Sequence, residues 1–210
     1  MQISGSTYTT VQNSGDIIVN VGSGAITLKN AANIDFKIVW SSDNNGTGDG
    51  DDDEVVVMNA AGTAATITEY YEEETFDVAD YGSKIKTIDG SAAAVDLEIT
   101  GNKLANAIIG GDGDDTLIGG KGNDTLTGGA GNDVFVYASG DGKDVIADYA
   151  VGDKIRITSG KISKSTVSGS DVIFTIGSGT LTVKKGKNKN ITITDASNNT
   201  TTKKIFQSGE

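Results

Sequence analysis

The chain contains three consecutive copies of one nine-residue unit in residues 110–136, GGDGDDTLI, GGKGNDTLT and GGAGNDVFV. Each copy has glycine at places one, two and four, aspartate at place six and a large apolar residue at place eight. A short fixed period of this kind is the signature of a solenoid, in which every repeat adds one small unit to a stack. The repeat therefore constrains the architecture more than any other feature of the sequence.

The unit predicts its own local geometry. Places one to six are expected to form a turn, where glycine permits positive φ and lets carbonyl oxygens point inward, and places seven to nine a short strand. Two units then make one coil, so turns 18 residues apart stack at about 4.8 Å, with Asp115 on Asp133 and Asn106 on Asp124. Calcium prefers six to eight oxygen ligands, and two stacked turns supply carbonyls plus one aspartate each. The pattern therefore predicts calcium ions between the turns.

The predicted core is thin. Only the place-eight residues Leu117, Leu126 and Phe135 are expected to point inward. A core one side chain thick buries too little apolar surface to offset the conformational entropy of the chain. Bound calcium is therefore expected to be part of the fold.

Weaker copies lie upstream. Residues 101–109 keep Asn106 in the aspartate place and Ile108 in the apolar place, and residues 92–100 keep only Ile99. Terminal repeats of a solenoid are usually atypical because they close the stack.

A weaker copy also lies downstream. Gly140, Gly142, Asp144 and Ile146 fit the pattern after a shift of two residues, which makes Tyr137–Ala138 an insertion. The stacked pair Asp124–Asp144 is therefore expected to span an irregular coil.

These units resemble the repeats-in-toxin (RTX) family, the calcium-dependent modules of many bacterial proteins exported by type I secretion. Residues 133–157 are also similar to the closing segment of such modules in serralysin-type proteases, lipases and mannuronan epimerases. The resemblance covers about residues 92–157. Because the family spans many activities, the resemblance alone selects none of them.

The resemblance implies a ligand set for each ion. Carbonyls at places one and three join the aspartate of one turn, and carbonyls at places two and four join the aspartate of the other. For one stacked pair these positions are Gly110, Asp112 and Asp115 with Gly129, Gly131 and Asp133. The complete set of candidate metal-binding residues is Asn106, Gly110, Gly111, Asp112, Gly113, Asp115, Gly119, Gly120, Lys121, Gly122, Asp124, Gly128, Gly129, Ala130, Gly131, Asp133 and Asp144.

Composition excludes several kinds of site. The 210 residues include no cysteine and no histidine, which excludes disulfides, thiol nucleophiles, Ser-His-Asp triads and histidine zinc sites. Arg156 is the single arginine, so there is no guanidinium cluster for phosphate or nucleic acid. No run is long enough to span a membrane. No catalytic residue is predicted.

A second repeat flanks the first. Residues 15–38 align without gaps to residues 170–193, and both contain the turn Gly-Ser-Gly between two alternating strands. Each copy predicts a hairpin followed by a third strand that turns back on itself. Two interpretations stay open. The units are caps on the open ends of the roll, or the chain is an excerpt of a longer array in which such units alternate with rolls.

An acidic loop, Asp43–Glu54, matches the spacing of an EF-hand loop at Asp43, Asn45, Thr47, Gly48 and Glu54. The residue at position 50 is a glycine rather than an apolar anchor, and the flanks read as strands rather than helices. A solvated hairpin loop is expected rather than a calcium site.

Two segments suggest a different partner. Residues 69–81, EYYEEETFDVADY, combine aromatic and acidic residues as sugar-binding surfaces do, although packing against the first coil is the commoner fate. Residues 160–210 carry eight lysines against three acidic residues, or +5, while residues 1–159 carry 9 − 26 = −17, which together give the net charge of −12. Such lysines contact an acidic polymer or, more commonly, form solvated strand faces that deter edge pairing.

The sequence thus predicts an elongated all-β fold, a parallel calcium β-roll flanked by two similar antiparallel β-hairpin units. The expected domains are an N-terminal β unit with the acidic loop (1–91), the roll (92–150) and a C-terminal capping or secretion unit (151–210). The expected function is a non-catalytic calcium-binding module that folds after export by a type I exporter, in a secreted or cell-surface bacterial protein. The alternative is a carbohydrate-binding accessory module of a polysaccharide-modifying enzyme. The N-terminus lacks a conventional signal peptide, which fits a C-terminal export signal or a fragment of a longer chain.

Overall fold

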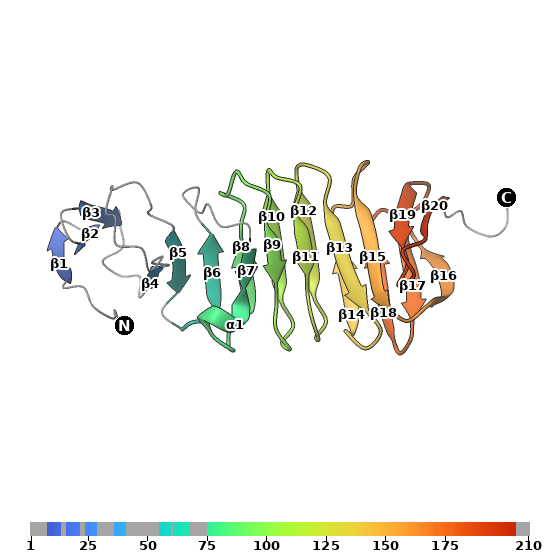
Figure 1. Cartoon of the computed structure of the whole chain (residues 1–210), viewed down its shortest axis with the longest axis horizontal. Helices are drawn as coiled ribbons and strands as arrows, with labels where there is room; N and C mark the ends of the chain where they lie inside the picture. The colour runs from blue at the N-terminus through green and yellow to red at the C-terminus, as the bar shows by residue number, and fades with distance from the viewer. Residues whose placement is uncertain are drawn as a thin grey trace.

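The computed structural model describes residues 8–13, 16–21, 24–28, 36–40, 55–59, 61–67 and 75–204. The described strands follow one another along the long axis of an elongated molecule (Figure 1). They form one sheet of ten strands, one of seven and one of three. The expected elongated all-β architecture is confirmed.

The ten-stranded sheet runs in the order β16 (Ile162–Ser168), β17 (Asp171–Ile176), β18 (Gly179–Val183), β14 (Lys143–Ile146), β12 (Thr125–Gly129), β10 (Ala107–Gly111), β8 (Thr87–Asp89), β6 (Ala64–Ile67), β5 (Val55–Asn59) and β4 (Phe36–Trp40). The seven-stranded sheet runs in the order β20 (Thr200–Lys204), β19 (Asn190–Thr194), β15 (Lys154–Ser159), β13 (Val134–Ala138), β11 (Thr116–Ile118), β9 (Glu98–Thr100) and β7 (Thr75–Asp77). The third sheet contains β1 (Tyr8–Asn13), β2 (Asp16–Val21) and β3 (Gly24–Leu28), and a single turn of helix, α1, spans Val78–Tyr81.

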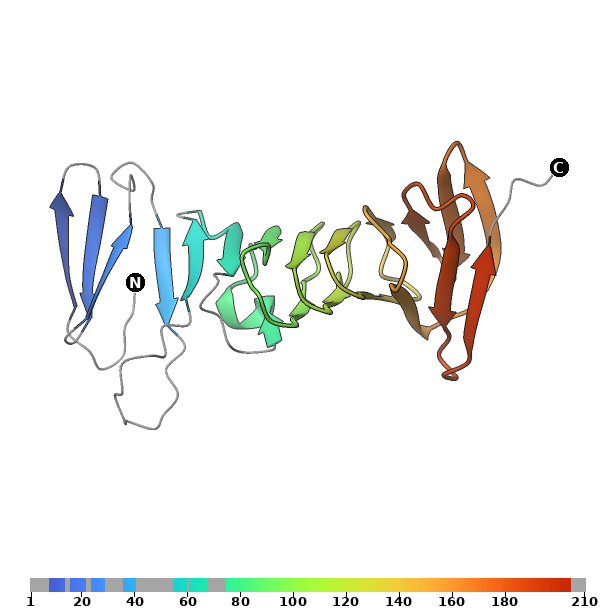
Figure 2. The ribbon, with the colours of Figure 1, turned by 90° about the horizontal axis from the view of Figure 1, so that it is seen from above.

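The chain alternates between the two large sheets and winds a parallel coil, which is seen from above in Figure 2. Leu117 pairs with Phe135 and Ile108 pairs with Leu126, so two nonapeptides make one coil as predicted. The next coil is longer by two residues, because Leu126 pairs with Ile146. The register shift between Tyr137 and Ala138 is where the predicted insertion lies.

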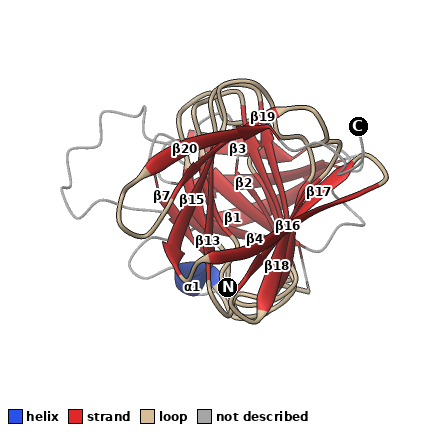
Figure 3. Ribbon diagram, turned by 90° about the vertical axis from the view of Figure 1, so that its right-hand side faces the viewer, coloured by secondary structure: helices blue, strands red, loops and turns tan. Residues whose placement is uncertain are grey.

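Two ladders of single apolar side chains, one on each large sheet, run the length of the core, and further buried side chains such as Leu97, Tyr137 and Tyr149 pack beside them. Viewed along the long axis, the strands lie behind one another and the loops form the rims (Figure 3). One ladder is Ala65, Ile88, Ile108, Leu126, Ile146 and Val183, and the other is Phe76, Ile99, Leu117, Phe135, Ile155 and Ile193. Every member is buried, and the place-eight residues point inward as expected.

Parallel pairing extends beyond the expected limits of 92 and 150 at both ends. Upstream, β6 pairs with β8 and β7 pairs with β9. Downstream, β18 pairs with β14 and β19 pairs with β15. The C-terminal unit therefore continues both sheets of the roll.

Residues 75–81, the described part of the aromatic segment, pack on the first coil as expected. Phe76 and Val78 are buried, and Tyr81 stacks on Phe76 with ring centroids 4.6 Å apart. The acidic loop 43–54 lies outside the described residues. In the described part of the chain, no helix is long and apolar enough to cross a membrane.

Candidate calcium centre

The place-six residues line up in two rows along the roll. The first row contains Asp115 and Asp133, which directly precede β11 and β13. The second contains Asn106 and Asp124, which directly precede β10 and β12, and Asp144, which is the second residue of β14. These positions follow from the repeat, because each lies two residues before an inward place-eight side chain.

Each aspartate in a row bonds to the backbone of the coil before it. Oδ1 of Asp133 accepts from the N–H of Asp115 at 3.0 Å, and Oδ1 of Asp115 accepts from Leu97 at 2.8 Å. In the second row, Oδ1 of Asp124 accepts from Asn106 at 2.7 Å, and Oδ1 of Asp144 accepts from Asp124 at 3.1 Å. The structure thus brings the two predicted stacked pairs, and the irregular third pair, into adjacent turns.

The Oδ2 oxygens of two of these aspartates mark the rows as candidate cation sites. Oδ2 of Asp115 and Oδ2 of Asp124 are buried and have no hydrogen-bond partner. An unpaired buried carboxylate oxygen is strongly unfavourable unless a cation neutralises it. These two atoms therefore fit a bound divalent cation, for which carboxylate oxygen is a preferred ligand.

The pKa values of these aspartates are also raised, because the carboxylates are buried without a nearby positive charge among the described residues. Burial, together with nearby acidic groups, raises the pKa of Asp115 and of Asp124 to about 6, although backbone hydrogen bonds act in the opposite direction. Burial likewise raises the pKa of Asp133 and of Asp144 to about 7. Removal from water disfavours the charged form, so four carboxylates in two rows hold protons more tightly than usual.

Glycine leaves the space that the free oxygens face. A Cβ on Gly119 would lie 2.5 Å from Oδ2 of Asp124, and one on Gly110 would collide with Oδ2 of Asp115. Further along the turn, Gly131 has φ of 103°, and a Cβ there would collide with the carbonyl oxygen of Gly113 in the preceding turn. Place-one and place-four glycines therefore keep side chains out of a cradle formed by carboxylate and carbonyl oxygens.

The remaining candidate residues can offer ligands only through their backbone. The place-three residues Asp112, Lys121 and Ala130 have exposed side chains, so only their carbonyls can face the turn. Among the described residues no group of three or more carboxylate, imidazole or thiol side chains gathers in one place. A cation site in this roll would therefore consist mainly of carbonyl oxygens with one aspartate per turn.

Asn106 differs from the aspartates of its row. Its Oδ1 accepts from the N–H of Asn102 at 2.9 Å, and its side-chain amide donates to the carbonyl of Ile85 at 3.0 Å. Both ends of the side chain are therefore occupied without a cation.

Asp153 is a row member that the sequence reading missed. It extends the first row, since its Oδ1 accepts from the N–H of Asp133 at 3.1 Å. Its Oδ2 accepts from the N–H of Ala150 at 2.6 Å, so both oxygens have protein partners. Asp153 lies nine residues after Asp144, but its unit has no glycine at places one, two and four, which hid this position, although Ile155 two residues later gives the place-eight signal.

The place-five residues form a second ladder that was also missed. The side chain of Asp96 accepts from the N–H of Asp114, and that of Asp114 accepts from Asn132, both at 2.7 Å. Place-five oxygens thus bond forward along the stack while place-six oxygens bond backward. The recurrence of Asp or Asn at place five was the sequence signal from which this ladder could have been predicted.

Residues 100–135 and 109–145 match the family described as RTX calcium-binding nonapeptide repeat, in four copies. No curated protein matches the chain. One solved structure with a related backbone is the crystal structure of the extracellular lipase LipA from Serratia marcescens, at 15% identity and a TM-score of 0.41 over 85% of this chain and 28% of the lipase chain. The matched region spans 28% of the length of that lipase chain.

Proposed function

The chain carries a module of RTX calcium-binding nonapeptide repeats, and we propose that calcium drives the folding of this module after the protein has left the cell. The module would be a non-catalytic part of a bacterial protein exported by type I secretion to the medium or the cell surface. The observation that carries the proposal is the pair of buried, unpaired oxygens, Oδ2 of Asp115 and Oδ2 of Asp124.

The physical argument begins with the calcium-free chain at neutral pH. Folding would remove four carboxylates from water with acidic neighbours and a core only one side chain thick, so the unfolded chain is favoured. Calcium supplies the missing positive charge. Its binding free energy then becomes folding free energy, because the stacked turns that hold it exist only in the fold.

We assign the ions to the stacked turns with unpaired oxygens. Asp115 with Asp133, and Asp124 with Asp144, would each supply carboxylate oxygens, and carbonyls at places one to four would supply the rest. Asn106 and Asp153 would close the ends of the rows, since their own side-chain groups already have protein partners.

This arrangement suits export. A chain that stays unfolded at the low calcium concentration of the cytoplasm can pass an exporter, and millimolar calcium outside then folds it. The exporter and the destination are parts of the proposal that the RTX likeness supports.

Circular dichroism of the full chain tests the proposal. We expect a weak β signal in chelator, a gain of β signal in millimolar calcium and a melting temperature that rises with calcium concentration. Magnesium at the same concentration is the ion control. The variants Asp115→Asn and Asp124→Asn should shift the calcium midpoint upward. An unchanged spectrum and melting temperature on adding calcium to the wild-type chain would contradict the proposal.

The structure gives the carbohydrate-binding alternative less support. Phe76 is buried and its ring stacks on that of Tyr81, so this pair does not offer free ring faces to a sugar. The alternative therefore depends on the exposed lysines of the C-terminal unit as the contact for an acidic polysaccharide, and binding on a glycan array would support that role.

A further inference from the structure

The three-stranded sheet at the N-terminus repeats the outer part of the C-terminal unit in the same register. Asn13 pairs with Asp16 as Ser168 pairs with Asp171, and the numbers differ by 171 − 16 = 155. The same difference relates the second pairing of each sheet, in which Val21 faces Gly24 and Ile176 faces Gly179. Thus β1–β2–β3 and β16–β17–β18 are two copies of one sheet.

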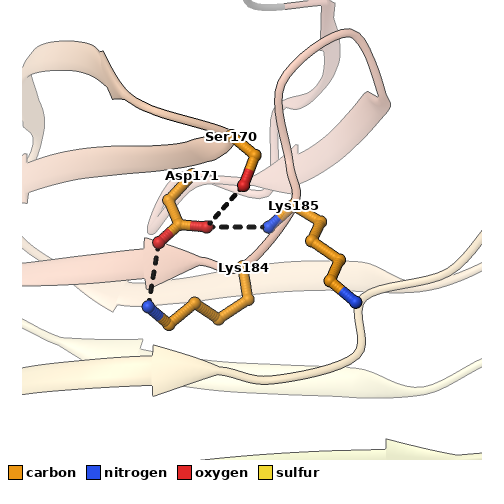
Figure 4. Close-up of polar contacts among 4 residues, drawn as sticks. All are labelled: Ser170, Asp171, Lys184 and Lys185. Atoms are coloured by element: carbon orange, nitrogen blue, oxygen red, sulfur yellow. Dashed lines mark hydrogen bonds and ion pairs between the residues drawn. The ribbon is translucent and has the colours of Figure 1, made fainter.

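The sequence agrees with this duplication. Val172, Phe174 and Ile176 are buried in β17, and the equivalent positions 17, 19 and 21 of β2 are Ile, Val and Val. In the C-terminal copy, Asp171 forms an ion pair with Lys184 at 2.8 Å and also accepts from the backbone N–H of Lys185 (Figure 4). The equivalents of the ion pair, at positions 16 and 29, are again Asp and Lys.

The strands after each hairpin also correspond. β4 pairs antiparallel with β5 as β19 pairs with β20, and Ile38 is the equivalent of Ile193. In both copies, the hairpin and the strand that follows it lie in different sheets.

The two copies differ in what lies beside them. In the C-terminal copy the roll occupies one edge of each sheet, since β14 pairs with β18 and β15 pairs with β19. In the N-terminal copy β3 is the last strand of its sheet and β4 is the last strand of the ten-stranded sheet. Among the described strands, the edges of β3 and β4 that correspond to the roll-binding edges therefore have no partner.

We propose that β1–β5 are a second roll cap, and that the free edges of β3 and β4 bind the open end of another nonapeptide β-roll. The occupant is a roll joined directly to the residues that lead into β1 in one polypeptide. The C-terminal copy supports a covalent link, because β15 ends at Ser159 and β16 begins at Ile162. A second copy of this chain is a poorer occupant, since its own C-terminal unit already covers its roll end.

A cap exchange within the full chain tests the proposal. Residues 160–203 are replaced by residues 5–59, so that the N-terminal unit is also placed after β15. We expect this chimera to melt in calcium within a few degrees of the wild type and to remain monomeric. A second chimera, in which residues 41–54 of the graft are replaced by 195–199, controls for loop length.

A proline substitution provides the matched control. The backbone N–H of Thr180 donates to the carbonyl of Gly142 in the roll at 2.9 Å, and Ala25 is its equivalent. Ala25→Pro in the grafted copy and Thr180→Pro in the wild type should both lower the melting temperature. The same Ala25→Pro change in the original N-terminal copy should leave the melting temperature unchanged, because no roll strand lies on that edge.

The outcomes separate this proposal from calcium-driven folding, since the wild type serves as the calcium reference throughout. If both chimeras behave like a chain that ends at Ser159, the N-terminal unit is not a cap. If Ala25→Pro has the same effect in both copies, the graft does not use the β3 edge and the proposal fails. Self-association of the wild type that Ala25→Pro abolishes would make a second copy the occupant and overturn the covalent arrangement.

Discussion

The backbone N–H of Asp115 donates a hydrogen bond of 3.0 Å to Oδ1 of Asp133, one coil further along the roll. This bond uses one oxygen of Asp133 to fix the spacing of the two turns. Oδ2 of Asp115 is buried and unpaired, and Oδ1 of Asp115 accepts from the N–H of Leu97 in the coil before. The two aspartates therefore lie in adjacent turns, and we propose that they share one ion.

A double-mutant comparison tests this shared site. Asp115→Asn and Asp133→Asn both keep a side-chain oxygen as acceptor but remove a charge, so each is expected to lose the same ion in calorimetry. The double variant should lose no further ion, because residues of one site are not additive. Asp112→Asn, at an exposed place-three position, is the control and should keep the full stoichiometry. Loss of two separate ions would contradict the pairing.

The perfect repeats made the centre of the fold predictable. Their period placed Leu117, Leu126 and Phe135 in the core and set the spacing of 18 residues between stacked strands. Glycine recurs at fixed places because a Cβ there would collide with oxygens of the stacked turns. The positions of the turns could therefore be predicted from the sequence alone.

The ends of the roll were less predictable because their coils lack the repeated glycines and aspartates. Ile88 continues the core ladder next to Ile108, but no glycine turn or aspartate marks its coil. At the other end, β18 and β19 read as a hairpin strand and a lone strand, and only tertiary pairing shows that they extend two different sheets. Asp153 was hidden because its unit lacks the glycines of places one, two and four.

The place-one glycines are expected to be intolerant of even a methyl group. Gly119 lies outside the left-handed region, so Gly119→Ala adds no backbone strain, but its Cβ would lie 2.5 Å from Oδ2 of Asp124. We expect calcium affinity to fall by about tenfold or more, equivalent to roughly 1.4 kcal/mol. Isothermal titration measures it. Lys121→Ala in the same turn changes an exposed side chain and should bind as the wild type does.

The response to pH should change sign with calcium. In the calcium-free fold, burial raises the pKa of Asp133 and Asp144 from 3.8 to about 7 and that of Asp115 and Asp124 to about 6. The folded state then binds more protons than the unfolded chain between about pH 4 and 7, so its stability falls as pH rises through this window. Acidification in chelator should therefore increase the β signal.

With calcium present, protons compete with the ion for the same oxygens, so acidification from about pH 7 to 5 should lower the melting temperature. Thermal melts at both pH values, with chelator and with calcium, give the four measurements required. The same direction of change under both conditions would count against ion binding at these carboxylates.

Asp153 is expected to stabilise the fold without adding an ion. Its Oδ1 accepts from the N–H of Asp133, and its Oδ2 accepts from the N–H of Ala150. Asp153→Asn can keep only one of these two bonds and should lower the melting temperature with the calcium stoichiometry unchanged. Asp133→Asn, the matched variant one coil earlier, should lose an ion. A lost ion in Asp153→Asn would make this residue a ligand.

The C-terminal unit should be required for tight calcium binding although it contains no nonapeptide turn. β18 and β19 cover the edges of β14 and β15, and the hydroxyl of Tyr149 in the roll accepts from the N–H of Thr192 at 2.9 Å. Ending the chain at Ser159 would expose those edges and the end of the core, and capping units keep solenoids soluble and cooperative.

We therefore expect the chain that ends at Ser159 to bind calcium more weakly or to aggregate, as measured by calorimetry and sedimentation. A full-length variant with Lys164→Ser and Lys203→Ser, two exposed lysines of the unit, separates charge from capping and should bind calcium as the wild type does. If the shortened chain stayed monomeric with undiminished affinity, the lysine-rich unit would be explained better as an export signal or a binding surface.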